Sequence, residues 1–345
     1  MPQPGFARLG LEDLSCAVST LAPMSQQVSV VPFEERHLDG AASLLAGRHR
    51  AQRLVEPGLD PAYEEPAACR SEIEALLTAD GTSGVAAVAG ENIVGYLLGT
   101  PLADSWGPNA WVTAAGHAVR EAELVRDLYA EAARRWVADG RTSHYALVPA
   151  TDPALVDAWF RLGFGHQHVH AIREVPDEGD PHAVDGVVVR RAERRDIAEL
   201  ARLDLALPEH QARSPVFSPL PPPSLEDVQA EWESDFDDER FATFVAERDG
   251  HVIGSAVGCP IEVSSTHTGL ALPRGAAFLG FAAVLPQARG GGAGRLLGER
   301  IIAWAREAGY PTIVTDWRMT NLLASRAWPR LGFRPIFYRL FRAIA

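Results

Sequence analysis

The chain has 345 residues, which is long for one domain and sufficient for two, each with a buried core. Hydrophobic residues make up 47% and charged residues 22%, and no apolar run is long enough to span a bilayer. The formal net charge of −13 repels nucleic acid and anionic membranes, so we expect neither as a partner. The cysteines at positions 16, 69 and 259 lack metal-ligand spacing and are odd in number, which indicates a reducing, cytoplasmic compartment.

The first segment, residues 1–26, reads as a disordered extension. It carries Glu12 and Asp13 where a signal peptide needs an unbroken apolar core. Met24 stands immediately before the first expected strand, so either Met1 or Met24 is the start of the protein.

The rest of the chain repeats itself. WFRLGF, beginning at Trp159, returns as WPRLGF at Trp328, and two earlier blocks return in the same order at similar spacing. Three such pairs indicate a duplicated domain, with a first repeat at residues 27–175 and a second repeat at 187–345. Residues 176–186 between them are acidic, contain proline and lack apolar periodicity, which is typical of a linker.

Both repeats show one order of expected elements, β-α-β-β-β-α-β-α-β, which predicts an α/β fold with a mixed sheet. A strand leads into a helix, and a hairpin follows after a variable region. Asp249-Gly250 is the hairpin turn of the second repeat. The expected first strands, first helices and hairpins are 28–32, 39–46 and 85–89 with 93–99, then 187–190, 196–205 and 241–247 with 251–258; the chain ends on a strand at 336–342.

Two segments have no counterpart in the first repeat. About ten extra residues follow the third strand of the second repeat, around 262–275. The segment 209–241 contains a proline cluster that a regular helix excludes. It is either a long surface loop or a lid over an acceptor site.

RGGGAG, at residues 289–294, joins an apolar strand to an amphipathic helix. The free N–H groups at the helix N-terminus face such a loop, and glycines allow a ligand to approach the backbone closely. Arg289 and Arg295 add positive charge. The loop is therefore a phosphate cradle or a flexible turn.

The residues around this loop resemble a known family. Val284-x-Pro286-x-x-Arg289-Gly-Gly-Gly-Ala-Gly-Arg resembles the acyl-CoA-binding motif of the GNAT superfamily of acyltransferases. Asn321-x-x-Ala-x-x-x-Trp328-x-x-Leu-Gly-Phe resembles its second motif. The likeness covers nearly all of the second repeat and, more faintly, the first. It implies two tandem GNAT-like domains, each a mixed, mostly antiparallel sheet flanked by helices.

The resemblance implies acetyl-CoA as cosubstrate and no metal. The fourth strand of the second repeat would hold the pantetheine arm, and the N–H of Val284 would polarise the thioester carbonyl. The glycine-rich loop would bind the pyrophosphate, and Asn321 would contact the pantetheine or anchor its own turn. The expected cofactor-binding residues are Ala282, Ala283, Val284, Arg289, Gly290, Gly291, Gly292, Ala293, Gly294, Arg295 and Asn321.

The proton donors and acceptors are less clear from the sequence. Trp328 stands where many members of the family have a tyrosine that protonates the CoA thiolate, and an indole cannot do so. Trp328 is then a wall of the pocket from which the thiolate leaves without full protonation, or Tyr338 or Ser325 is the acid. Asp316, His267 or a water relay to bulk is the base.

The first repeat serves as an internal control. REAELVRDL, at 120–128, aligns with RGGGAGRLL, and Glu121 and Glu123 stand where N–H groups should meet a pyrophosphate. The first repeat is therefore a degenerate domain that braces the sheet or shapes the acceptor pocket. Its histidines 166, 168 and 170 alternate along a strand, and we expect a solvated strand face there rather than a metal site.

The expected function is N-acetyl transfer from acetyl-CoA to a primary amine of a small molecule, by a monomer or homodimer. The amine would attack directly in a ternary complex, because no cysteine lies in the motif region. The alternatives are a non-catalytic CoA-binding or regulatory module, and another acyl-CoA reaction such as O-acylation, decarboxylation or off-loading.

Overall fold

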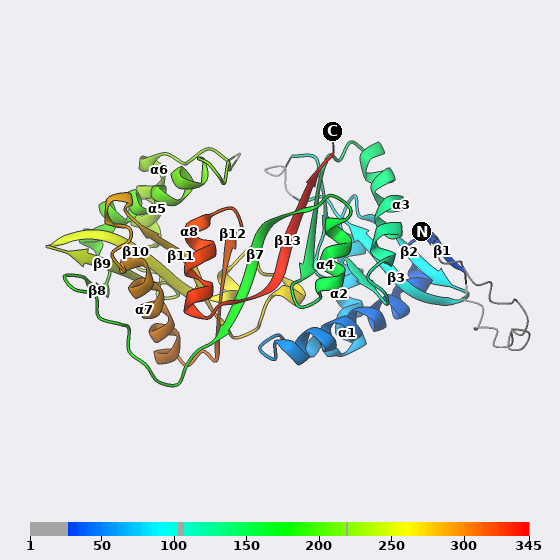
Figure 1. Cartoon of the computed structure of the whole chain (residues 1–345), viewed down its shortest axis with the longest axis horizontal. Coiled ribbons are helices and arrows are strands. Elements are labelled where there is room, and N and C mark those ends of the chain that lie inside the picture. Colours follow the sequence, from blue (N-terminus) through cyan, green and yellow to red (C-terminus); the bar gives the residue numbers. More distant parts are fainter. Residues whose placement is uncertain (1–26, 103–106, 219, 345) are drawn as a thin grey trace, which may run out of the picture.

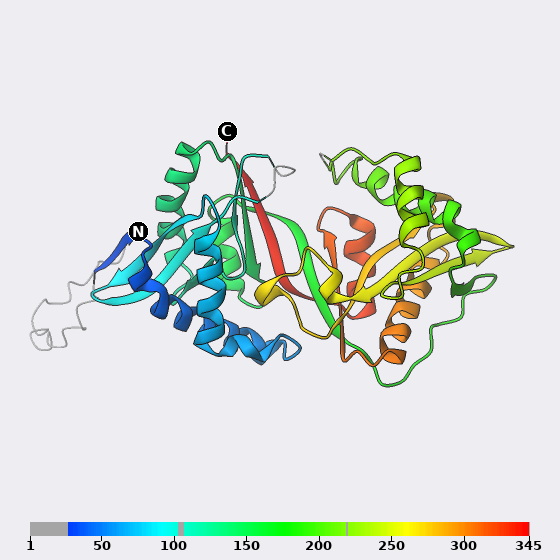
Figure 2. The same ribbon diagram turned by 180° about the vertical axis from the view of Figure 1, so that it is seen from behind.

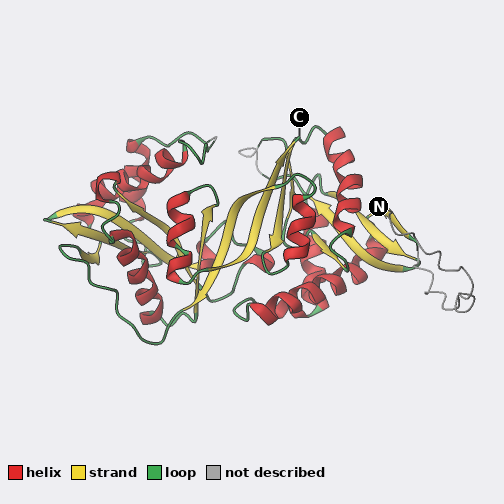
Figure 3. Ribbon diagram, in the orientation of Figure 1, coloured by secondary structure: helices red, strands yellow, loops and turns green. Residues whose placement is uncertain are grey.

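The computed structural model of the chain describes residues 27–102, 107–218 and 220–344, so the extension expected at 1–26 lies outside it. Helices cover both faces of long strands (Figure 3). The first repeat contains β1 Val28–Pro32, α1 Leu38–Val55, α2 Pro66–Thr78, β2 Ser83–Ala89, β3 Asn92–Gly99, β4 Asn109–Val112, β5 His117–Val119, α3 Leu124–Ala138, β6 Ser143–Pro149, α4 Pro153–Phe160 and β7 Gly165–Glu174. The second contains β8 Val188–Arg191, α5 Ile197–Gln211, α6 Leu225–Asp235, β9 Ala242–Arg248, β10 His251–Pro260, β11 Ala277–Val284, α7 Ala293–Glu307, β12 Thr312–Arg318, α8 Leu322–Ala327 and β13 Arg334–Ala343.

The expected fold class is confirmed, since most strand pairs are antiparallel. Both repeats contain the predicted elements in order, with a second helix after the first in each repeat and one additional short strand before α3 in the first repeat. The β9–β10 hairpin turns at Asp249 and Gly250, whose φ angles of 52° and 76° are those of a two-residue type I′ turn. The first helix of each repeat is longer than expected. The segment 209–241 is not entirely a loop, because it contains the helix α6, which packs against α5.

The two repeats exchange their last strands, which the sequence did not predict. The strand order β4-β6-β13-β7-β12-β11-β10-β9-β8 forms one sheet of nine strands, and β1-β2-β3-β5 forms a sheet of four. β7 of the first repeat pairs with β12, and β13 of the second repeat pairs with β6. The two strands lie side by side at the centre of the molecule (Figure 1). Each repeat therefore completes its sheet with a strand of the other.

Side-chain contacts also tie the repeats together. The inserted segment between β10 and β11 reaches toward the helices of the first repeat (Figure 2), where Leu270 and Ala271 join a buried cluster with α1 and α2. Arg274 pairs with Asp60 at 2.8 Å. The guanidinium of Arg334 on β13 pairs with Glu56, at 2.8 Å, and with Glu174.

In the second repeat, α7 lies on one face of the sheet and α5 and α6 on the other (Figure 1). The expected apolar stripe of α7 is buried, with Leu297, Ile301 and Ala305 fully covered. The linker runs beside α7, where the backbone N–H of His182 donates to Glu299 at 2.8 Å.

Candidate active site

β11 and β12 pair only at their first residues and then diverge. Ala277, Phe278 and Leu279 lie opposite 313–315, and the Oγ1 of Thr315 donates to the Leu279 carbonyl at 2.9 Å. Gly280 is an extra residue in the β10–β11 ladder, a bulge that bends the strand. Residues 280–284 therefore have no strand partner on the β12 side, and an opening forms there.

The backbone of β11 presents donors to this opening. The N–H of Leu285 donates to the Ile253 carbonyl at 2.9 Å, toward β10. Because N–H directions alternate along an antiparallel ladder, the N–H groups of Val284 and Ala282 point away from β10 and into the opening. The predicted oxyanion role of Val284 requires this direction.

The glycine-rich loop closes one end of the opening. Gly290 and Gly292 have φ angles of 83° and 84°, a conformation that glycine adopts without strain. Gly292 is the N-cap of α7, and the first helical bond runs from the N–H of Leu296 to its carbonyl. Within the described residues, the N–H groups of 290–295 have no acceptor, so they form a ready anion site.

Together these elements enclose a cleft of about 300 Å³. All the expected cofactor-binding residues line it except Gly291, on which a Cβ would lie 2.8 Å from the Arg248 guanidinium. The further lining residues are Ala206, Leu207, His210, Ala288, Leu323, Ala324, Ala327 and Trp328.

Asn321 and Trp328 form one side of the cleft. The Oδ1 of Asn321 accepts from the N–H groups of Leu323 and Ala324, at 3.2 and 3.4 Å, and so caps α8. Asp152 caps α4 in the same way at the equivalent position of the first repeat. Two roles were expected for Asn321, and these hydrogen bonds correspond to the anchoring of its own turn. Trp328 is buried, and its ring is a wall of the cleft.

The equivalent loop of the first repeat is closed. The N–H groups of Leu124, Val125 and Arg126 donate to the carbonyls of 121–123, at 3.0 to 3.2 Å. The carboxylate of Glu123 pairs with Arg126 and Arg161. Three N–H groups of this helix start are thus used within the turn, and acidic side chains stand where the second repeat has glycines, which supports a single acyl-CoA site in the second repeat.

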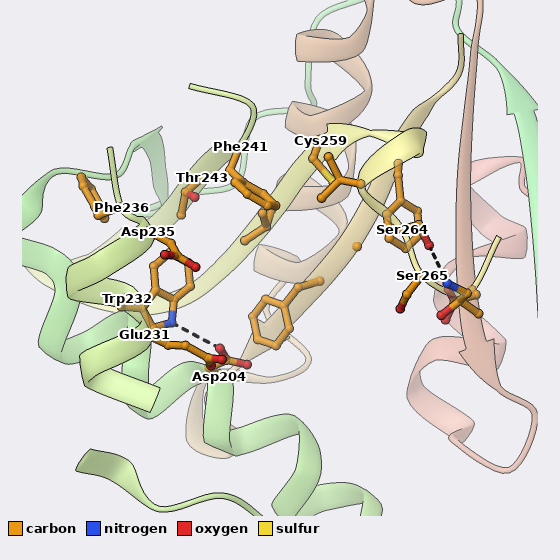
Figure 4. Close-up of a pocket in the computed structure, with 17 residues that line it drawn as sticks. Asp204, Glu231, Trp232, Asp235, Phe236, Phe241, Thr243, Cys259, Ser264 and Ser265 are labelled. Carbon is orange, nitrogen blue, oxygen red and sulfur yellow. Dashed lines mark hydrogen bonds between the residues drawn. The ribbon is translucent and has the colours of Figure 1, made fainter. Parts of the chain in front are cut away.

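A second cavity, of about 490 Å³, adjoins the cleft along β11, because Gly280 and Phe281 line it directly before Ala282 (Figure 4). We call it the acceptor pocket. None of its lining residues, within the described part of the chain, is a lysine, arginine or histidine. They are Asp204, Glu231, Trp232, Asp235, Phe236, Phe241, Thr243, Val257, Cys259, Val263, Ser264, Ser265, Thr266, Phe278, Gly280, Phe281 and Asp316.

Carboxylates dominate the charge of the acceptor pocket. Asp204, Glu231 and Asp235 gather around Trp232 on the α5–α6 side (Figure 4). Burial raises the pKa of Asp204, whose carboxylate accepts a hydrogen bond from the Trp232 indole at 3.2 Å. No ion pair to these three carboxylates exists among the described residues. Their charge is therefore available to a ligand.

Asp316, on β12, lines the same pocket. Its Oδ1 lies 2.7 Å from the Nε2 of His168, which β7 brings from the first repeat. Burial alone would raise the pKa of Asp316, but the hydrogen bond from His168 lowers it below its ordinary value. Asp316 is therefore ionised at neutral pH.

The expected solvated histidine face is wrong. His170 is buried, and its ring contacts His267 with centroids 4.6 Å apart. Burial lowers the pKa of His267 to about 4, and its Nδ1 lies 2.9 Å from the Ser264 hydroxyl. The strand exchange covers this face of β7 with the second repeat. No group of His, Cys, Asp and Glu with metal-binding geometry occurs among the described residues.

Neither expected acid is among the described residues that line the cleft. The ring of Tyr338 lies tilted against that of His166, with ring centroids 4.2 Å apart, and two strands separate β13 from β11. The hydroxyl of Ser325 donates to the Met319 carbonyl at 2.7 Å.

His210, which the sequence did not single out, does line the cleft. Its Nε2 is buried without a hydrogen-bond partner in the described part of the chain. It was missed because the expected helix stopped at 205, before Pro208, whereas α5 continues to Gln211.

Comparisons with known proteins agree with this geometry. Residues 206–333 match the model of the Acetyltransferase (GNAT) family. A GCN5-related N-acetyltransferase from Sphaerobacter thermophilus is 16% identical with a TM-score of 0.56, over 92% of this chain and 95% of that one. A fungal glucosamine N-acetyltransferase region is 16% identical with a TM-score of 0.51, over 94% of this chain and 39% of that one. The search of curated proteins finds no match.

Residues 206–333, most of the second repeat, therefore match the GNAT family, and the likeness in fold to a solved structure extends over both repeats. The family match supports acyl transfer as the activity. In the part of the chain that the structure describes, no helix has the length and apolar character needed to cross a membrane.

Proposed function

We propose that the protein is an N-acetyltransferase that moves an acetyl group from acetyl-CoA to a primary amine of a small molecule. The observation on which this proposal depends is that two cavities meet on β11. The cleft with free N–H donors ends where the acidic acceptor pocket begins, at residues 280–282. A thioester in the first would face an amine in the second.

On the donor side, the N–H groups of 290–295 bind the pyrophosphate at the N-terminus of α7. The open edge of β11 takes the pantetheine arm as if it were a further strand. The N–H of Val284 then donates to the thioester oxygen, where negative charge develops during attack.

On the acceptor side, a pocket with four carboxylates and no lining cation, among the residues described, favours a positively charged ligand. Asp316 holds the reacting amine near β11. Asp204, Glu231 and Asp235 lie on the α5–α6 side and suit a second positive charge, and the ring of Trp232 offers a cation–π contact. The aromatic walls suit an apolar body between the charges. We therefore propose a diamine with an apolar or aromatic body as acceptor.

The reaction is direct attack. The amine nitrogen forms a bond to the thioester carbon, and the carbon–sulfur bond breaks. The amine attacks in its neutral form. The carboxylate of Asp316 accepts a hydrogen bond from the attacking nitrogen and receives the proton that this nitrogen loses as the amide forms. His210 is the titratable side chain of the cleft that faces the departing thiolate, while Trp328 supplies an apolar wall.

A panel of amines tests this proposal. Monoamines, aliphatic diamines and aromatic diamines are incubated with acetyl-CoA, and both thiol release and product mass are measured. The expected result is one added acetyl group, with the highest kcat/KM for diamines of apolar body. CoA binding without any acylated product would instead support a non-catalytic module, and acylated hydroxyl compounds would support O-acylation.

A further inference from the structure

The first repeat contributes side chains to the site of the second. Exchange of the last strands places β7 directly beside β12, with Asp316 opposite His170 and Arg318 opposite His168. The Nε2 of His168 lies 2.7 Å from the Oδ1 of Asp316. The first repeat, which lacks a phosphate-binding loop of its own, thus supplies a side chain that contacts Asp316 in the acceptor pocket.

The hydrogen bond occupies one oxygen of the carboxylate. No bond to the Oδ2 of Asp316 exists among the described residues, and Asp316 lines the acceptor pocket. Because a carboxylate held at one oxygen has a defined orientation, its other oxygen can be directed at an incoming amine. The Nδ1 of His168 is buried without a hydrogen-bond partner in the described chain, so no second hydrogen bond competes for the orientation of the ring, which also meets that of His170 edge-on.

We propose that His168 is a positioning residue of the acetyl-transfer reaction: it orients the carboxylate of Asp316, so that the active site is built from both repeats. This inference rests on the proposed function. In the transfer, an N–H bond of the amine breaks and an O–H bond forms at Oδ2 of Asp316, while His168 keeps its Nε2–H bond to Oδ1 throughout.

Other charged groups around Asp316 do not replace this role. The titratable and charged groups that face it or His168 are His170 on β7, Arg318 on β12, Arg339 on β13, Tyr145 on β6, His267 in the inserted segment, and the pocket carboxylates Asp204, Glu231 and Asp235. Burial lowers the pKa of both His170 and His267, which keeps them neutral at pH 7. Arg318 donates to Gln211 and Arg339 to Gln167.

Two variants of His168 test the proposal. His168→Ala removes the donor, so the Asp316 carboxyl stays buried without its partner and its pKa rises. The acid limb of kcat/KM then moves to higher pH, and kcat at neutral pH falls about 10- to 100-fold. His168→Gln keeps an N–H donor, so the acid limb of kcat/KM and the kcat at neutral pH are both expected to match those of the wild type. CoA affinity is expected to stay unchanged in both variants.

His166→Gln is the matched control. His166 lies on the same strand but contacts Phe160 and Tyr338 instead of Asp316, so its replacement leaves the pH profile in place. A wild-type profile in folded His168→Ala would overturn the inference while the proposed function stands.

Carbon-13 NMR of the Asp316 carboxyl, assigned with Asp316→Asn, gives a readout that needs no turnover. The carboxyl is expected to titrate at higher pH in His168→Ala than in the wild type and His168→Gln. If no amine is acetylated at all, the proposed function fails. An Asp316 titration that is the same in every His168 variant would then separately refute the coupling.

Discussion

The Nε of Arg289 donates a hydrogen bond to the carbonyl oxygen of Val284 at 3.1 Å. This bond ties the start of the phosphate loop to the end of the strand that carries the expected oxyanion donor. Arg295 pairs with Glu299 at 2.7 Å. Both arginines are thus held beside the loop through their Nε atoms, and the backbone N–H groups of 290–295 lie next to them as anion donors.

Gly292→Glu is expected to abolish CoA binding. The new side chain would adopt a left-handed conformation that costs about 1–2 kcal/mol, would press on Val184, and would put a negative charge at the pyrophosphate position. We expect at least a ~100-fold loss of CoA affinity by calorimetry. Gly309→Glu is the matched control, because Gly309 has a φ of 79° at the far end of α7 and no neighbour within 4 Å of its Cβ position. Equal CoA affinity in the two variants would contradict the cradle.

Val284→Pro removes one N–H group without removing a sheet hydrogen bond, since that N–H points away from β10. Loss of an oxyanion donor lowers kcat about 100- to 1000-fold, with a smaller effect on CoA affinity. Stopped-flow turnover and calorimetry measure the two separately. An unchanged kcat in the folded variant would assign the oxyanion role elsewhere.

Asp204→Asn and Glu231→Gln are expected to raise KM for a diamine about tenfold or more, because each removes a charge-assisted contact worth about 1.5–3 kcal/mol. KM for a monoamine and the affinity for CoA should change little. Asp237→Asn serves as control, since Asp237 is exposed and pairs with Arg194 outside the pocket. Equal effects on monoamines and diamines would show that the second charge is not recognised there.

His210→Asn tests protonation of the departing thiolate. If the imidazole donates the proton, kcat falls about 100-fold while the KM for the amine is unchanged. The measurement is kcat for thiol release with saturating substrates. An unaffected kcat would mean that the thiolate leaves unprotonated beside Trp328.

Arg334→Gln is expected to loosen the contact between the repeats. Its guanidinium bonds to Glu56, which is only 5% exposed, so the variant leaves a buried carboxylate unpaired. Because Arg334 itself is 44% exposed, we expect a loss of about 1–3 kcal/mol in the free energy of unfolding. The bond to Arg334 also lowers the pKa of Glu174. The ion pair between Arg334 and Glu174 therefore contributes to the free energy of unfolding above the unfolded-state pKa of Glu174. This contribution is lost as the pH falls through the folded-state pKa. Urea unfolding of wild type and variant at neutral and acid pH should therefore show a smaller difference at acid pH.

Local features of the active site could be predicted from the sequence. The glycine loop, its strand and its helix depend on residues next to one another in the chain, because positive φ angles, free N–H groups and helix caps are local properties. The Asp249-Gly250 turn and the cap at Asn321 belong to the same class. The proton donors were not predictable, because the tertiary structure decides that His210 lines the cleft and that Tyr338 and Ser325 do not.

The sequence by itself determined the element order, the duplication, the phosphate loop of the second repeat and its loss from the first. The tertiary structure alone decided which sheet each last strand joins. β7 and β13 are equivalent strands of two repeats, and either partner satisfies their backbone hydrogen bonds, so the choice depends on contacts across the whole molecule. That choice buries His170 and partly covers His166 and His168, where the sequence predicted a solvent-facing strand, and it brings His168 to Asp316 across 148 positions of the chain.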